Sequence, residues 1–269
     1  MSVKNGIAYY IRKANLAQFA DKVRFYLKKV QYSTTNRHFK KTHPEIKLPP
    51  ERFIYETYKL NYEHYFTDGL ETAKEILELI NRFLVIKKEH RILDWGCGPA
   101  RITRHIPVFG GNHFIAFGTD SNREYIKWNQ ENIGNVIFKE NRLDPPLNFE
   151  ENYFDIIFGF SVLTHLSREK HISWIKEIHR VLKPGGLLIV TTQGEAYNNK
   201  LTKDERIAFS QGKLVCRSTK TEGDRIFSAF QPPAFMKDLL KDFEILEIQK
   251  GNEGKTLFGY QDTWVVKKI

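Results

Sequence analysis

The 269-residue sequence has little cysteine and no long apolar run. Its two cysteines, Cys97 and Cys216, are too few for a disulfide framework and lack the spacing of a metal-ligand cluster. No stretch approaches the roughly 18 consecutive apolar residues of a membrane-spanning helix. The basic N-terminus also lacks the apolar segment of a secretory signal. We therefore expect a metal-free, cytoplasmic protein in a reducing compartment, with a core built from the 41% of residues that are apolar.

Positive charge is concentrated in the first part of the chain. Residues 1–50 hold eleven Lys or Arg and two acids, Asp21 and Glu45, so they carry +9 of the net charge of +10. The rest of the chain is close to neutral. This distribution disfavours nucleic acid as a partner, because proteins that act on nucleic acid usually surround the active site with positive charge.

Residues 7–30 have the pattern of an amphipathic helix. Apolar residues recur at the spacing of one helical face: Leu16, Phe19, Ala20, Val23, Leu27 and Val30. Base rates favour packing of this face on the body of the protein or on a partner subunit. Two alternatives stay open. The helix could lie on the anionic inner surface of a membrane, or it could bind nucleic acid. We interpret the polar residues 31–50 as a connecting arm.

From residue 70 onward, short apolar runs alternate with helical segments. We expect helices at 70–84, 100–108, 122–132 and 168–182, and strands at 91–94, 114–119, 136–140, 154–160, 187–192, 243–249 and 262–267. Repeated β-α-β units predict an α/β fold with a mostly parallel sheet covered on both faces. Pro184-Gly185-Gly186 predicts a turn before the fifth strand.

The alternation stops at residues 194–231, which are expected to form an insertion containing a hairpin. We therefore predict a basic helical arm and cap at 1–69 and one α/β domain at 70–269, with 194–231 as a lid over the site where the substrate binds. The sequence leaves the oligomeric state open.

A glycine-containing turn follows the first strand, in the segment Asp94-Trp95-Gly96-Cys97-Gly98. Glycines can adopt positive φ and let a ligand approach the backbone closely. In an open parallel sheet, nucleotide-like ligands bind at the carboxyl ends of the strands. The spacing excludes a dinucleotide fingerprint, because Arg101 stands where a third glycine is needed, and no G-K-[ST] follows to make a P-loop.

With this loop, residues 91–192 resemble the class I, Rossmann-like S-adenosylmethionine-dependent methyltransferases. The resemblance implies a doubly wound, mostly parallel seven-stranded sheet of order 3-2-1-4-5-7-6, with the last strand antiparallel. It also implies S-adenosylmethionine as the cofactor and S-adenosylhomocysteine as the product, without a metal.

The resemblance assigns cofactor contacts to residues at the ends of the first four strands. These are Asp94, Gly96, Cys97, Gly98, Asp120, Ser121, Asn141, Leu143, Phe160 and Ser161. Asp120 ends the second strand, where the family holds the ribose hydroxyls; a helix N-cap is the alternative role for this carboxylate. Asn141 and Leu143 match the adenine contacts, with Asp144 as a rival for Asn141.

His165 is the candidate catalytic residue. It follows the fourth strand, and an imidazole of near-neutral pKa suits removal of a hydroxyl proton during methyl transfer. A structural role for this histidine stays open. Direct in-line transfer then needs positioning and desolvation of the two reactants rather than covalent chemistry.

Four further blocks resemble a bacterial subgroup of methyltransferases, types 11 and 12, that is linked to glycan or secondary-metabolite methylation. These blocks are Leu48-Pro49-Pro50, 160–166, 191–195 and 259–262. The residues that could line an acceptor pocket are Tyr58, Gln193, Gln261 and Asp262. The sequence departs from the subgroup at Gln193 and Tyr260, where histidine is expected.

Three functions follow, in order of preference. The first is O-methylation of a small molecule or glycan. The second is methylation of RNA or protein, with the basic arm holding the substrate. The third is a non-catalytic cofactor-binding subunit that docks on a partner protein through residues 7–30. The sequence does not identify the acceptor.

Overall fold

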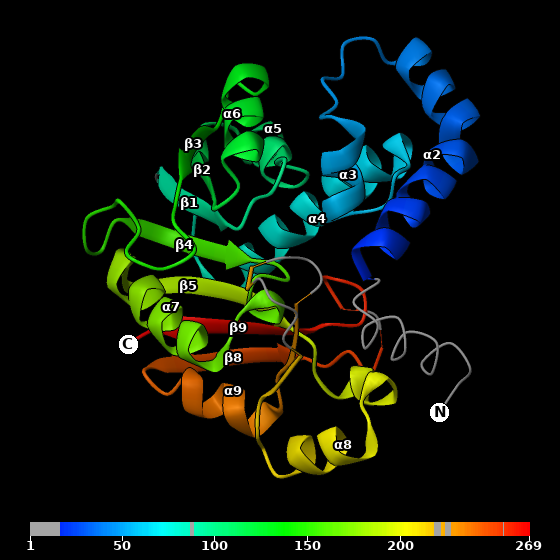
Figure 1. The fold of residues 1–269 in the computed structure, drawn as a ribbon. Helices are drawn as coiled ribbons and strands as arrows, with labels where there is room; N and C mark the ends of the chain where they lie inside the picture. Colours follow the sequence, from blue (N-terminus) through cyan, green and yellow to red (C-terminus); the bar gives the residue numbers. More distant parts are fainter. Residues whose placement is uncertain (1–16, 87–88, 218–221, 224–226, 255) are drawn as a thin grey trace. The chain divides into compact units, whose positions relative to one another are not determined.

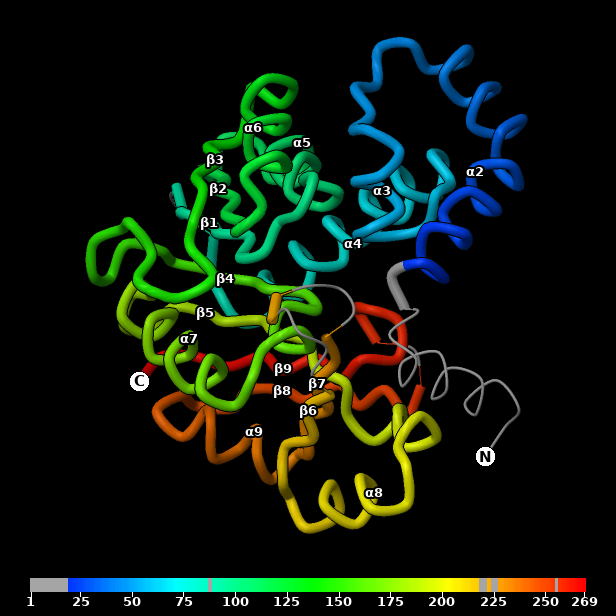
Figure 2. The backbone as a smooth tube through the Cα atoms, in the orientation of Figure 1, coloured from blue at the N-terminus to red at the C-terminus, as the bar shows by residue number. Residues whose placement is uncertain are grey.

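The structure is a computed structural model that describes residues 17–86, 89–217, 222–223, 227–254 and 256–269. The chain separates into two units, Met1–Asp68 and Gly69–Ile269. Figure 1 shows the elements of each unit and Figure 2 traces the backbone through them.

The N-terminal unit is built around the long helix α2 (Ala17–Thr42), α3 (Glu51–Thr57) and the start of α4 (Tyr62–Phe83). Its buried core side chains are Phe39, Ile54, Tyr55, Leu60, Tyr62 and Tyr65. Asn36 ties α2 to the segment before α4, because it donates to Leu60 O at 3.3 Å and accepts from Tyr62 N at 3.0 Å.

Helix α2 differs from the sequence expectation in two ways. It continues to Thr42, so the interpretation of residues 31–50 as a connecting arm is wrong for 31–42. This stretch is polar, but it contains neither proline nor glycine, and Asn36 and Phe39 give it buried contacts. The predicted helical residues 7–16 lie outside the described residues.

The larger unit holds a seven-stranded sheet of order β3-β2-β1-β4-β5-β9-β8. Its strands are β1 (His90–Trp95), β2 (Phe114–Asp120), β3 (Ile137–Glu140), β4 (Phe154–Gly159), β5 (Leu182–Thr192), β8 (Phe243–Gln249) and β9 (Asp262–Lys268). The first five pair in parallel, and β9 is antiparallel to both β5 and β8. The predicted order and the antiparallel last strand are confirmed.

Two apolar layers cover the faces of this sheet. Successive strand residues alternate between them, so Ile92 belongs to one cluster and Leu93 to the other. The first layer includes side chains of α4, α5 (Ile106–Gly110) and α6 (Arg123–Asn132). The second includes side chains of α7 (Arg168–Val181) and α9 (Pro233–Leu239).

Local structure departs from expectation at two places. The predicted helix at 100–108 is shorter, comprising the 3-10 turn η1 (Thr103–His105) and α5. Pro184-Gly185-Gly186 lies inside β5 rather than before it, where the pairing with β4 shifts register. A Cβ at Gly186 would lie 2.8 Å from Lys183 O, so this irregularity needs glycine.

The segment after β5 contains η4 (Glu195–Lys200), α8 (Lys203–Ser210), and a short antiparallel pair of β6 (Val215–Arg217) and β7 (Ser228–Phe230). Strand β7 contacts the 3-10 turn η3 (Leu163–His165), which follows β4. The predicted hairpin is thus present in the described residues.

Candidate active site

The glycine turn after β1 is tied to the end of β2. Gly96 N and Cys97 N donate to Thr119 O at 2.8 and 2.9 Å. Gly96 and Gly98 have φ values of 78° and 53°, which glycine adopts without strain. A Cβ at Gly96 would overlap Val162 Cγ2, so the loop packs directly against the segment that follows β4.

Two carboxylates flank this turn, of which Asp94 is buried and Asp120 is half-buried. Asp94 Oδ2 accepts from Thr103 Oγ1. Burial, with a smaller contribution from the like charge of Asp120, raises the pKa of Asp94 to about 7. Burial also raises the pKa of Asp120, although backbone amides that donate to this carboxylate oppose the shift. Two acids held close together in low dielectric favour a ligand that brings positive charge or hydroxyl donors.

Asp120 holds the glycine turn itself. Its Oδ2 accepts from Gly98 N at 2.9 Å, and its Oδ1 accepts from Asn122 N at 2.8 Å. The N-cap of α6 is Asn122, whose side chain accepts from two backbone amides of the first turn. The N-cap role considered for Asp120 is therefore wrong, and the ligand role remains a prediction.

The remaining residues of this edge are placed around the turn. Cys97 is buried, with Asn129 Nδ2 at 3.8 Å from its Sγ and 2.9 Å from Gly98 O. Ser121 is exposed. Asn141 N donates to Asp120 O at 3.0 Å, and among the described residues the buried Asn141 Oδ1 has no hydrogen-bond partner.

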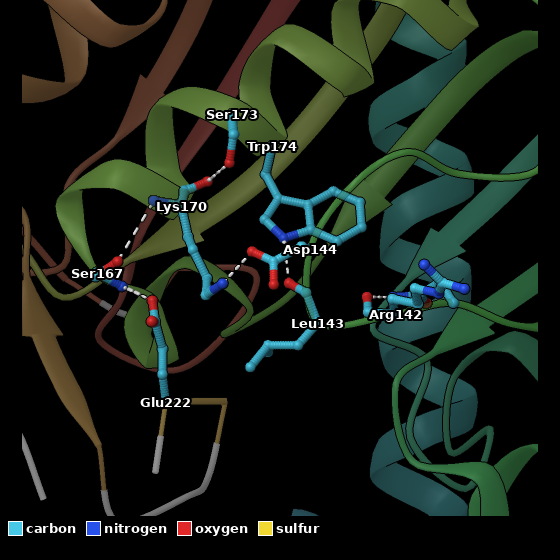
Figure 3. A network of polar contacts seen from close by, with 9 residues as sticks. Arg142, Leu143, Asp144, Ser167, Lys170, Ser173, Trp174 and Glu222 are labelled. Carbon is cyan, nitrogen blue, oxygen red and sulfur yellow. Dashed lines mark hydrogen bonds and ion pairs between the residues drawn. The ribbon is translucent and has the colours of Figure 1, made fainter. Parts of the chain in front are cut away.

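The loop after β3 is fixed by α7 (Figure 3). Trp174 Nε1 donates to Leu143 O at 3.0 Å, and Lys170 Nζ forms an ion pair with Asp144. Asp144 keeps 67% of its side chain exposed and is already paired. Asn141, with its buried oxygen, is therefore the better candidate of the two for a polar ligand contact.

A closed hydrogen-bond ring joins the ends of β4, β5 and β9. Ser161 N donates to Thr191 Oγ1 at 2.8 Å, Thr191 Oγ1 donates to Gln261 Oε1 at 2.7 Å, and Gln261 Nε2 donates to Ser161 Oγ at 2.5 Å. The ring holds Ser161 at a φ of 61°, a strained value for a non-glycine residue. Beside it, the ring of Phe160 packs on Phe258 at 5.3 Å between centroids.

His165 is held in one orientation by the segment that precedes β7. Its Nδ1 lies 3.0 Å from Phe227 O, and its own carbonyl accepts from Gly223 N at 3.0 Å. Because a carbonyl can only accept, Nδ1 carries the proton and Nε2 is the basic nitrogen of the neutral ring. Glu222 secures the same segment by accepting from Ser167 N, at the N-terminus of α7 (Figure 3).

The predicted acceptor residues lie in different surroundings. Gln261 and Asp262 are buried, and Asp262 Oδ1 accepts from Gly251 N at 2.8 Å. Burial, with a smaller contribution from the charge of Glu195, raises the pKa of Asp262. Gln193 is half-buried. Tyr58 belongs to the N-terminal unit, where its hydroxyl donates to Asp68.

The contacts of several residues at this edge were not predictable from the sequence. Thr103 lies in the predicted helix 100–108, and Thr191 lies in the predicted strand 187–192 and in the block 191–195, but neither position indicated its hydrogen-bond partner. Gln231 makes two hydrogen bonds to the backbone of Gln193. Its side-chain Oε1 accepts from Gln193 N at 2.9 Å, and its backbone N donates to Gln193 O at 3.0 Å. Such partners lie far apart in sequence, and no local pattern marks them.

The fold and this constellation define a class of protein: an α/β domain that binds a nucleotide-like cofactor at the carboxyl ends of its strands. Residues 92–186 match a family model described as a methyltransferase domain. The chain is 28% identical over 192 residues to "Probable methyltransferase ltbC" of Aspergillus luteorubrus, covering 67% of each chain. Two further curated relatives are matched over only 39% and 47% of their lengths.

Two solved structures show the same fold. A methyltransferase of Methanosarcina mazei superposes with a TM-score of 0.53 and 22% identity, over 71% of this chain and 97% of that one. The 1,6-didemethyltoxoflavin-N1-methyltransferase of Burkholderia thailandensis, solved with S-adenosylhomocysteine, has a TM-score of 0.52 and 15% identity, over 74% and 78%. The larger unit of this chain is a class I S-adenosylmethionine-dependent methyltransferase domain.

Within the described residues, no helix combines the length and apolarity needed to cross a membrane. The same residues contain no cluster of three or more His, Cys, Asp or Glu side chains arranged to hold a metal ion.

Proposed function

We propose that this domain methylates a hydroxyl group of a small molecule or glycan, with His165 as the general base. The observation that carries the proposal is the bond between His165 Nδ1 and Phe227 O, which leaves Nε2 as the proton acceptor. A hydroxyl acceptor needs such a base, because a neutral hydroxyl is a weak nucleophile. The Burkholderia enzyme methylates a nitrogen atom of a small molecule, so it supports the small-molecule part of this proposal and not the choice of oxygen as the target.

The residues present fit S-adenosylmethionine. The positive-φ glycines Gly96 and Gly98 carry no side chains, and beside them lie the buried Asp94 and the half-buried Asp120. The two oxygens of a carboxylate offer about four acceptor sites. Asp120 can therefore accept from ribose hydroxyls while it still accepts from Gly98 N and Asn122 N. Asn141 Oδ1 is a buried acceptor with no partner among the described side chains and backbone groups.

When bound, the cofactor supplies an electrophilic methyl group on a sulfonium. In our proposal, Asp94 accepts from the amino group of its methionine part and the backbone of residues 96–98 lies along that part. Asp120, with Ser121 beside it, takes the ribose, and Asn141 with the backbone of Leu143 takes the adenine. Phe160 and Ser161 border the region where the methyl group is presented.

His165 removes the hydroxyl proton as the acceptor is methylated. The segment at 222–223 and 227 holds the ring and fixes its tautomer, so little reorganisation is needed when the proton moves. Gln193 and Asp262 remain candidates for acceptor contacts. The buried amide of Gln261 instead positions Ser161, because both of its ends are engaged in the ring described above.

The test combines calorimetry with a methyl-transfer assay. Wild type should bind S-adenosylmethionine, and Asp120→Ala should weaken binding by about 1–3 kcal/mol, as expected for a lost charge-assisted hydrogen bond. A panel of sugars and phenols supplies the hydroxyl acceptors, and release of S-adenosylhomocysteine measures turnover. His165→Ala should lower turnover roughly 10²–10⁴-fold and leave cofactor affinity unchanged.

Absence of S-adenosylmethionine binding at millimolar cofactor would contradict the assigned cofactor site. Wild-type turnover in His165→Ala would exclude the general-base role while leaving the cofactor assignment intact. His165→Gln, which keeps a hydrogen-bonding side chain but no basic nitrogen, distinguishes lost proton transfer from lost packing.

A further inference from the structure

Helix α2 has a second apolar face that the described residues of the N-terminal unit, 17–68, leave exposed. Phe25, Tyr32 and Phe39 point into the core of that unit. The opposite face bears a stripe of exposed side chains: Phe19 (67%), Val23 (42%), Tyr26 (64%), Leu27 (66%) and Val30 (75%). Spacings of three and four residues place the members of this stripe on one side of the helix, along about three turns.

This stripe is the face that the sequence pattern predicted to be packed. Scattered exposed apolar residues are ordinary, but a contiguous apolar stripe on one helix marks an interaction surface. The helix already has its structural contacts on the other side, through Asn36 and the core residues. The exposed stripe is thus not needed to hold α2 in its unit.

Basic side chains border the stripe. Lys22 and Lys29 lie seven positions apart on one flank, and Arg24 lies on the other flank. Lys29 pairs with Glu51 but keeps 51% of its side chain exposed. The only acid within α2 is Asp21, and it faces the core side, where its Oδ1 accepts from Tyr55 Oη at 2.9 Å.

We propose that α2 docks this protein on membranes rich in anionic lipid. An apolar stripe with cationic flanks can insert at the boundary between headgroups and acyl chains while its lysines and arginine meet the anionic headgroups. A second copy of α2 is a poorer occupant, because two apposed stripes would bring like charges such as Lys22 and Arg24 of both copies together. We favour the lipid over an acidic protein partner, because the structure, in the residues that it describes, shows no protein surface seated on this stripe.

Sedimentation of the full chain with lipid vesicles tests the proposal. The protein should pellet with vesicles of phosphatidylcholine and phosphatidylglycerol, and not with phosphatidylcholine alone, and high salt should weaken the binding. Leu27→Glu should lower the partition coefficient by roughly tenfold or more, because an apolar anchor is replaced by a repelled charge. Ile172→Glu, which replaces an exposed apolar residue (49%) of α7, is the matched control and should bind as wild type does.

A second variant, Lys22→Glu with Arg24→Glu, keeps the stripe and should lose binding to anionic vesicles. Circular dichroism checks that each variant keeps its helix, and S-adenosylmethionine calorimetry checks the methyltransferase domain independently of membrane binding. Failure of wild type to pellet with anionic vesicles overturns the proposal, as does equal pelleting of wild type and Leu27→Glu. A dimer in light scattering that Leu27→Glu dissociates, without vesicle binding, would assign the stripe to self-association instead.

Discussion

Substitution of Gly96 by alanine should destabilise the glycine turn for two reasons. The first is the backbone conformation, because a φ of 78° costs a non-glycine residue about 1–2 kcal/mol. The second is steric, because the new methyl group would overlap Val162 Cγ2 and lie 3.6 Å from Val162 Cβ. Valine is stiff about χ1 and cannot turn away at low cost, so overpacking adds about 1–3 kcal/mol.

Gly185→Ala supplies the matched control. Gly185 has a nearly equal φ of 74°, but nothing lies within 4 Å of the position that its Cβ would take. The Gly185→Ala variant should therefore lose only the stability that the unfavourable backbone conformation costs, about 1–2 kcal/mol. Adding Val162→Ala to Gly96→Ala should recover the packing part, which a double-mutant cycle isolates.

Urea unfolding measures these stabilities, and calorimetry measures S-adenosylmethionine affinity. We expect Gly96→Ala to be less stable than Gly185→Ala by at least about 1 kcal/mol and to lose cofactor affinity by at least about tenfold. Equal destabilisation by the two alanine substitutions would refute the packing argument. Unchanged affinity in Gly96→Ala would refute the assignment of this turn to the cofactor.

Three further predictions concern charge. Burial raises the pKa of Asp94 to about 7, so the carboxylate that accepts from the cofactor's amino group forms only as the pH rises through 7. The affinity for S-adenosylmethionine, measured by calorimetry, should therefore increase from pH 6 to 8 in wild type and stay constant in Asp94→Asn. Burial lowers the pKa of His171 to about 4, so the unfolded chain binds this proton at a higher pH than the folded chain does. Between pH 6.5 and 4, His171 should account for about 3 kcal/mol of the stability that wild type loses, and urea titrations should show a smaller loss in His171→Gln. Glu222→Ala should lower turnover without changing cofactor affinity, because it loosens the segment that orients His165; unaltered turnover would contradict that role.

The sequence predicted the fold of the larger unit well, because its signals are local. Alternating strands and helices lead to a parallel sheet, and right-handed crossovers then restrict the strand order. The glycine turn and Asp120 were identifiable for the same reason, since each lies at the end of a strand and at the spacing of one β-α-β unit. The structure places them together through the bond from Gly98 N to Asp120 Oδ2.

Expectations failed where a weak local signal met a tertiary contact. The polar residues 31–42 read as an arm, yet buried Asn36 and Phe39 hold them in a helix. Pro184-Gly185-Gly186 read as a turn, yet pairing with β4 draws it into an irregular stretch of β5. In both places, packing outweighed intrinsic preference.

The sequence by itself predicted the alternation of strands and helices, because hydrophobic periodicity is a property of contiguous residues. The strand order and the cofactor class followed from the resemblance that the glycine turn and the acid at the end of the second strand bear to a methyltransferase family. Only the tertiary structure decided that Gln261 holds Ser161, that Phe227 fixes the tautomer of His165, and that the apolar stripe of α2 is exposed among the described residues. Ser161 and Gln261 are 100 residues apart. Contacts of this kind depend on the path of the whole chain through space, and a local pattern does not encode that path.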